Sequence, residues 1–96
     1  MSFTNYEMVQ GEQVIELGYP DNDVAVFVYA PEGKVVLGGG GVVPADPEAV
    51  WALTYCRPFF DSVSYGFIVQ AHLMSGTVSQ AGSVVGWAIC ATVEDD

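Results

Sequence analysis

Basic residues are nearly absent from this sequence. Its 96 residues include one lysine, Lys34, and one arginine, Arg57, against twelve acidic residues, for a formal net charge of −10 at pH 7. Proteins hold nucleic acid largely by neutralising phosphates with Lys and Arg, so this composition argues against direct nucleic-acid binding. It favours a basic protein surface as the partner, because opposite charge speeds association. A net charge of this size also keeps an apolar protein in solution.

Cysteine and histidine are scarce too. The chain has two cysteines, Cys56 and Cys90, no Cys-x-x-Cys pair, and one histidine, His72. These give neither a disulfide framework nor the ligand spacing of a zinc site, and we expect both thiols to be buried and reduced. Asp21–Asp23 begins like a calcium loop, but the glycine and the closing glutamate do not follow in register. The sequence therefore predicts no metal and no cofactor.

Membrane and export signals are also missing. No apolar run approaches the roughly 18 residues of a membrane-spanning helix, and the first ten residues lack the basic and apolar regions of a signal peptide. We expect no membrane association and a cytoplasmic location, in the host cytoplasm if a phage encodes the chain. The length of 96 residues predicts a single compact domain, 1–96, with 94–96 as a frayed acidic tail.

Apolar residues, in contrast, are plentiful. They make up 51% of the chain, against about 45–50% in soluble domains. A chain this short buries only about two-thirds of the surface that it exposes when unfolded. Some apolar surface should therefore meet a partner or another copy, and we expect a homo-oligomer. The candidate self-association surface carries Ile68, Met74, Val84 and Cys90.

Five segments have the composition or alternation of β-strands. Residues 14–17 are a short candidate that extends back towards Tyr6, and 24–30 should be a central strand buried on both faces. Pro31–Gly33 predicts a tight turn that closes a short hairpin between the strand at 24–30 and a strand from Lys34. The alternation over 63–74 puts Val63, Tyr65, Phe67, Val69, Ala71 and Leu73 on one apolar face, and that over 84–93 does the same for Val85, Trp87, Ile89, Ala91 and Val93.

A helix is predicted over 46–57. Asp46 suits the N-cap, Pro47 the first helical position, and Pro58 ends the helix. The four glycines before it, Gly38–Gly41, lack the Gly-Lys-Ser/Thr or G-x-G-x-x-G pattern of a phosphate loop. They suit a bend or bulge at an edge strand, or the close approach of another backbone. The predicted fold class is α+β, a small antiparallel sheet of about five strands with this helix packed on one face.

Enzyme chemistry has a weak basis in this sequence. Cys56, His72 and Asp61 are the residue types of a cysteine nucleophile, its base and an orienting acid. No family signature surrounds them. A cysteine in the middle of a helix also lacks the helix N-terminus that lowers a thiol pKa. We therefore do not expect an enzyme.

The function favoured by these observations is a small acidic protein-interaction module, an inhibitor or adaptor that docks on a basic surface. Small acidic phage proteins that disarm bacterial defence, such as anti-CRISPR proteins, are similar in size and charge, and a nucleic-acid mimic is the extreme form of this function. The similarity is one of composition, with no shared motif. The carboxylates expected to bind the partner are Glu7, Glu12, Glu16, Asp21, Asp23 and Glu32.

The alternative is a small-ligand binding or sequestering protein. Its pocket would lie between the helix end and the sheet, or at a subunit interface. The shortage of positive charge argues against highly phosphorylated ligands. The side chains expected to line the pocket are Tyr55, Arg57, Phe59, His72 and Trp87.

Overall fold

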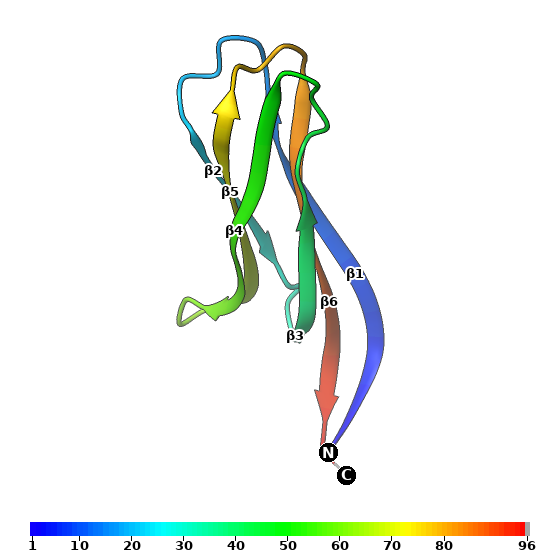
Figure 1. Ribbon diagram of the computed structural model, residues 1–96. Helices are drawn as coiled ribbons and strands as arrows, with labels where there is room; N and C mark the ends of the chain where they lie inside the picture. The colour runs from blue at the N-terminus through cyan, green and yellow to red at the C-terminus, as the bar shows by residue number, and fades with distance from the viewer. Residues whose placement is uncertain (96) are drawn as a thin grey trace.

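The computed structural model describes residues 1–95, which form a β-sandwich of two three-stranded antiparallel sheets (Figure 1). The molecule is elongated, with extents of 53 × 22 × 17 Å. One sheet has the order β1-β6-β3, with β1 at Ser2–Ile15, β6 at Gly82–Glu94 and β3 at Lys34–Val42. The other has the order β2-β5-β4, with β2 at Asp23–Tyr29, β5 at Tyr65–Gly76 and β4 at Ala49–Phe60.

The α+β prediction is wrong, because residues 46–57 form a turn and most of strand β4. Asp46 does accept the backbone N–H of Glu48, at 2.9 Å, but this bond closes a turn next to an isolated bridge between Asp46 and Ala49. From Ala49 the chain is rich in β-branched and aromatic residues and pairs with β5. Pro58 is tolerated because β4 is an edge strand. No helix occurs in residues 1–95, and so none that could span a membrane.

The facing sides of the two sheets form the core. The alternation predicted over 63–74 is confirmed for Phe67, Val69 and Ala71, which are buried, but Tyr65 is exposed and Val63 lies exposed in the turn before β5. The prediction of a central strand at 24–30 is wrong: β2 is an edge strand, and only every second residue is buried. Its other side chains point away from the core, which leaves Phe27 and Tyr29 exposed.

The apolar pattern of β6 predicted that the face with Trp87 and Ile89 would meet the core. The structure shows that the opposite face does. Val84, Ala88 and Cys90 are fully buried, whereas Ile89 is exposed and Trp87 is half-buried on the outside. The inward positions of β6 are small because the two sheets approach closely there.

A row of three glycines crosses the inner side of the β1-β6-β3 sheet at this close approach. Gly11, Gly86 and Gly41 are paired across the three strands. A Cβ at Gly41 would lie 2.5 Å from Val69 Cγ1, and one at Gly86 would lie 3.0 Å from Val69 Cγ2. Real Cβ atoms do not tolerate the first of these distances. The glycine row therefore makes room for the valine side chains of the facing sheet.

The four consecutive glycines lie inside strand β3 and face alternate sides of the sheet. Gly39 faces the core, where an added Cβ would be 3.0 Å from the Phe67 ring, and Gly40 lies on the outside under the indole of Trp87. A bulge separates Val36 from Gly38 in the pairing with β6. The predicted bulge and the predicted close approach of another backbone both occur, but they lie inside edge strand β3. The four glycines do not form a linker between β3 and the next element.

The turn predicted at Pro31–Gly33 is present, but the hairpin that it was predicted to close is wrong. The N–H of Lys34 donates to the carbonyl of Pro31 at 3.0 Å, and Gly33 has a φ of +84°. The strands on its two sides do not pair with each other, because β2 and β3 belong to different sheets.

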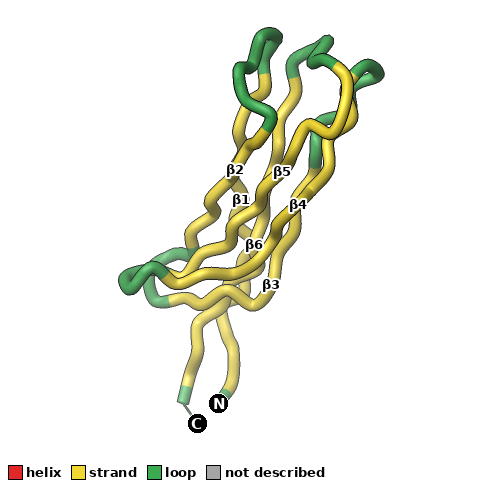
Figure 2. Tube along the Cα trace, turned by 60° about the vertical axis from the view of Figure 1, so that its left-hand side comes forward, coloured by secondary structure: helices red, strands yellow, loops and turns green. Residues whose placement is uncertain are grey.

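The two ends of the chain lie side by side at the lower tip (Figures 1 and 2). Ser2 pairs with Glu94, and this part of β1 and β6 extends below the other sheet. Of the tail predicted at 94–96, Glu94 is the last residue of β6 and Asp96 lies outside the described residues.

Candidate functional site

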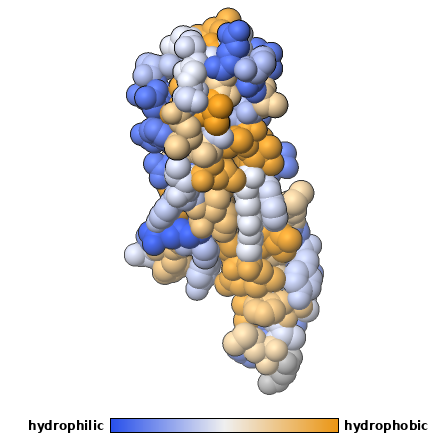
Figure 3. All heavy atoms as spheres, in the orientation of Figure 1, coloured by the Kyte–Doolittle hydropathy of each residue, from blue (hydrophilic) through white to orange (hydrophobic). Residues whose placement is uncertain are grey.

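Three loops meet at the upper end of the sandwich in Figure 1, and five of the twelve acidic residues lie in these loops or at the start of β2. The loops are residues 16–22, 43–48 and 77–81, and no lysine or arginine occurs in them. In Figure 3, hydrophilic side chains gather over these loops. We call this region the acidic end; its carboxylates are Glu16, Asp21, Asp23, Asp46 and Glu48.

Asp46 ties two of the loops together. Its carboxylate accepts the hydroxyl and the N–H of Ser79, the latter at 2.8 Å, and the N–H groups of Glu48 and Gln80 at 2.9 and 3.3 Å. The hydrogen bond from the Ser79 side chain, followed by the backbone bonds from Glu48 and Ser79, lowers the pKa of Asp46 to about 2. Hydrogen bonds of this kind favour the charged form. The ionised carboxylate thus fixes the position of Glu48 at the acidic end.

The third loop is anchored by backbone bonds and by its aromatic residue. The N–H of Tyr19 donates to the carbonyl of Glu16 at 3.0 Å, and Tyr19 packs against the core. At the start of β2, Asp23 Oδ1 lies 2.7 Å from His72 Nδ1. These contacts hold Glu16 and Asp23 in place, whereas Asp21 stands exposed between them.

The structure brings together only half of the carboxylates predicted to bind a partner. Glu16, Asp21 and Asp23 lie at the acidic end. Glu12 lies on the outer side of the β1-β6-β3 sheet, and Glu32 lies in the β2–β3 turn at the opposite end of the molecule.

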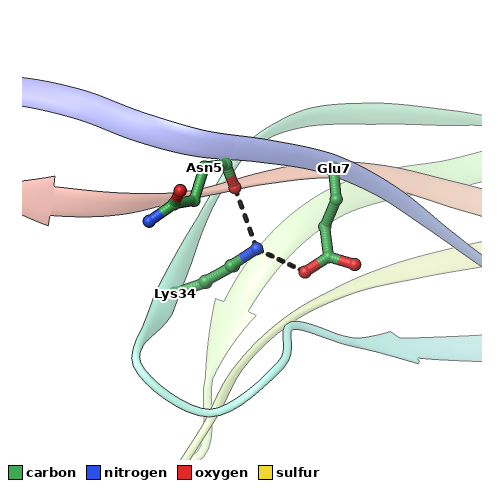
Figure 4. Close-up of polar contacts among 3 residues, drawn as sticks. All are labelled: Asn5, Glu7 and Lys34. Carbon is green, nitrogen blue, oxygen red and sulfur yellow. Dashed lines mark hydrogen bonds and ion pairs between the residues drawn. The ribbon is translucent and has the colours of Figure 1, made fainter.

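Glu7 is engaged within the chain. Lys34 on β3 reaches across β6 to the Glu7 carboxylate on β1 and donates to the carbonyl of Asn5 at 2.8 Å (Figure 4). Beneath them lies Cys90, where burial, and then the charge of Glu7, raises the pKa of the thiol. One of the two cations of the chain is therefore neutralised internally.

Four of the five residues predicted to line a pocket share one flat surface. Tyr55, Arg57, Phe59 and His72 lie on the outer side of the β2-β5-β4 sheet. Trp87 lies on the outer side of the other sheet, against Gly40. The structure thus separates Trp87 from the rest by the thickness of the sandwich, and the helix end that was to complete the pocket does not exist.

Phe59 is the centre of an aromatic cluster on that surface. Its ring meets those of Phe27 and Tyr29 edge to face, with centroid distances of 6.0 and 5.5 Å. It also covers Gly66, where an added Cβ would be 2.4 Å from Phe59 Cζ. The guanidinium of Arg57 lies 5.0 Å from the centre of the Tyr55 ring, a cation–π distance.

Two open grooves occur elsewhere. One of about 540 Å³ lies at the lower end between the β2–β3 and β4–β5 turns, with Glu32, Lys34 and Tyr65 in its wall. One of about 420 Å³ lies beside the β1–β2 loop, with Glu16 and Tyr19 in its wall. Neither contains a residue predicted for the ligand pocket.

The residues considered for cysteine catalysis are far from forming a site. Asp61 lies in the β4–β5 turn, where it accepts the N–H groups of Ser64 at 2.7 Å and Val63 at 3.0 Å, and these bonds lower its pKa. His72 lies towards the other end of β5, beside Asp23. Within residues 1–95, no group of three or more His, Cys, Asp or Glu side chains could hold a metal ion.

The two cysteines differ in exposure. Cys90 is buried as expected, but Cys56 is exposed because β4 is an edge strand and not a core helix. Since the thiolate is the reactive form, Ellman's reagent should modify Cys56 quickly and Cys90 only after unfolding. Titration of the native and the denatured protein should give one and two thiols, and two fast thiols in the native protein would contradict the burial of Cys90.

The self-association surface predicted from the sequence is split by the fold. Val84 and Cys90 are in the core, whereas Ile68 and Met74 lie on the outer side of the β2-β5-β4 sheet. Comparison with protein-family models, curated proteins and solved structures finds no match to this chain. A function is therefore proposed from the chemistry of its surface.

Proposed function

We propose that this chain is a small protein-interaction module whose acidic end docks on a basic surface of a partner protein. The observation that carries the proposal is the segregation of charge. Four carboxylates stand on two of the three loops and a fifth, Asp23, begins β2, with no lysine or arginine in these segments. Both cations lie elsewhere: Lys34 is paired with Glu7, and Arg57 is in the middle of β4.

The anchoring of the loops favours binding. Association has to overcome the entropy lost when mobile loops become ordered. Here the contacts of Asp46 with Ser79 and of Asp23 with His72 hold the loops before any partner arrives. The acidic end therefore presents its charge in a fixed arrangement, which speeds encounter with a basic surface and suppresses binding to acidic ones.

A partner of this kind includes the groove with which a cytoplasmic protein binds DNA or RNA. Such a groove is lined by Lys and Arg that neutralise phosphates. A protein that covered it with carboxylates would act as an inhibitor, and one that bound next to it would act as an adaptor.

The proposal is tested with a fluorescein-labelled oligoarginine peptide and fluorescence anisotropy at low and high ionic strength. The test variant is Glu16→Gln/Asp21→Asn/Glu48→Gln, and the control, Glu32→Gln/Glu94→Gln/Asp95→Asn, removes the same charge elsewhere. An exposed ion pair contributes about 0.2–1 kcal/mol, so loss of three predicts roughly tenfold weaker binding for the test variant. Binding should also weaken as salt rises. If both variants lose affinity equally, net charge and not the acidic end is responsible.

A further inference from the structure

Both outer sides of the sandwich are apolar. The outer side of the β2-β5-β4 sheet, the aromatic face, carries the ring cluster, with Phe27 54% and Tyr29 51% exposed. The opposite side, the tryptophan face, has Met8 62% and Val42 57% exposed beside Trp87. Monomeric proteins rarely expose large apolar patches, and this chain exposes several large apolar side chains on each side.

Each face carries one unengaged charge, and the two charges have opposite signs. On the aromatic face, Asp23 is next to His72, and Arg57 has no carboxylate partner among residues 1–95. On the tryptophan face the charged residue is Glu12, which likewise makes no ion pair within the described part of the chain. In a chain with a net charge of −10, these faces are where two copies can meet with the least repulsion.

The two charges lie at neighbouring levels along the long axis. Val69 of β5 packs against Gly86 of β6. Arg57 is paired with Ile68, next to Val69, and Glu12 is paired with Val85, next to Gly86. Because β5 and β6 run in opposite directions along the long axis (Figure 1), the two charges lie one residue to either side of this contact. The charges belong to β4 and β1, which lie on opposite lateral edges of the sandwich. They meet when the next copy is rotated by half a turn about the normal to the sheets, because its β1 then lies over β4 of the first copy while the two faces still overlap fully.

We propose that copies of this chain associate head to tail, with the aromatic face of one copy on the tryptophan face of the next. Arg57 then lies against Glu12 of the partner subunit. Because the two faces differ, the contact is heterologous and generates a closed ring or an open stack. The proposal does not depend on what the acidic end binds.

The experiment uses variants that block one face each, with native mass spectrometry and sedimentation velocity. Phe27→Glu/Tyr29→Glu blocks the aromatic face, and Met8→Glu/Val42→Glu blocks the tryptophan face. All four side chains are more than half exposed, so the fold should be retained, as circular dichroism will check. Val63→Glu, in the β4–β5 turn away from both faces, is the control and should assemble like the parent.

The parent chain should form assemblies, and each blocked variant alone should be monomeric. An equimolar mixture of the two blocked variants should form a one-to-one dimer and nothing larger, because one intact face of each kind remains. A monomeric parent would overturn the proposal. So would a dimer of the tryptophan-blocked variant alone, since that result means that the aromatic face pairs with itself.

Charge reversal tests the contact between Arg57 and Glu12. Arg57→Glu and Glu12→Arg should each weaken assembly by tenfold or more, because each places like charges together. The double variant should recover most of the loss, since the pair is then restored with its signs exchanged. A double variant as weak as the two changes added together would show that these residues do not meet.

Discussion

Replacing Gly39 with alanine is expected to lower the free energy of unfolding by about 2–3 kcal/mol, the effect of forcing an extra atom into a packed core. A Cβ at this position would lie 2.3 Å from the carbonyl oxygen of Trp87 and 3.0 Å from the Phe67 ring. The oxygen belongs to the backbone of β6, the middle strand of its sheet, so it cannot move aside alone. In contrast, Gly38→Ala meets nothing within 4 Å, and it should gain about 0.5–1 kcal/mol because glycine weakens a strand.

Urea and thermal denaturation of the two variants will measure this difference. In a domain of this size 1 kcal/mol corresponds to roughly 4–8 °C, so the Tm of Gly39→Ala should fall by about 10 °C or more. The glycine row gives a graded series. Alanine at Gly11, where the added Cβ would lie 3.6 Å from Val26, should leave stability nearly unchanged. Alanine at Gly86 should lower stability, and alanine at Gly41 should lower it further. Equal losses at Gly38 and Gly39 would show that backbone freedom, not space, requires the glycines.

Replacing Asp46 with asparagine is expected to have a large, pH-dependent effect on stability. The folded protein holds the pKa of Asp46 at about 2, against 3.8 for an unperturbed group. A lowered pKa in the folded state means that the ionised carboxylate contributes stability above 3.8, and that this contribution is lost as pH falls towards 2. The Tm of Asp46→Asn should therefore lie several degrees below that of the parent at neutral pH, and the gap should close in acid.

Thermal unfolding across a pH series measures this gap, with Asp21→Asn as the control. Asp21 is exposed in the neighbouring loop, and its replacement leaves the hydrogen bonds between Asp46 and Ser79 in place. The control should follow the parent at every pH. A gap for Asp46→Asn that stays constant down to the lowest pH would show that the shape of the side chain, and not its charge, holds the loops.

The sequence predicted local features of this fold better than its pairing. The alternation at Phe67, Val69 and Ala71 and the turn at Gly33 are local and are present, whereas the hairpin predicted at this turn depends on pairing and does not form. Asp46, Pro47 and Pro58 also gave local signals, but these are equally compatible with a turn followed by an edge strand. Pairing with β5 decided between the two, and no single segment contains that information.

The inward face of β6 could not be predicted for a related reason. Alternation gives two possible faces, and the bulky one, with Trp87 and Ile89, looked like the core. The small face is buried because Gly86 meets glycines on both neighbouring strands, which is known only once the register is known. The arrangement of the charged surface residues could not be predicted for the same reason, because it too depends on strand pairing. Asp46 and Glu48 were assigned to a helix, and the engagement of Glu7 by Lys34 depends on the strand order.

The central position of β6 has a consequence for the time course of folding. In their sheet, β1 and β3 pair only with β6, which is synthesised after the other five strands. The β4–β5 hairpin and β2 can pair earlier, but β1 and β3 must wait with unpaired edges, a condition that favours aggregation. One whole sheet therefore forms in a single late step that joins distant parts of the chain, and such steps make folding slow.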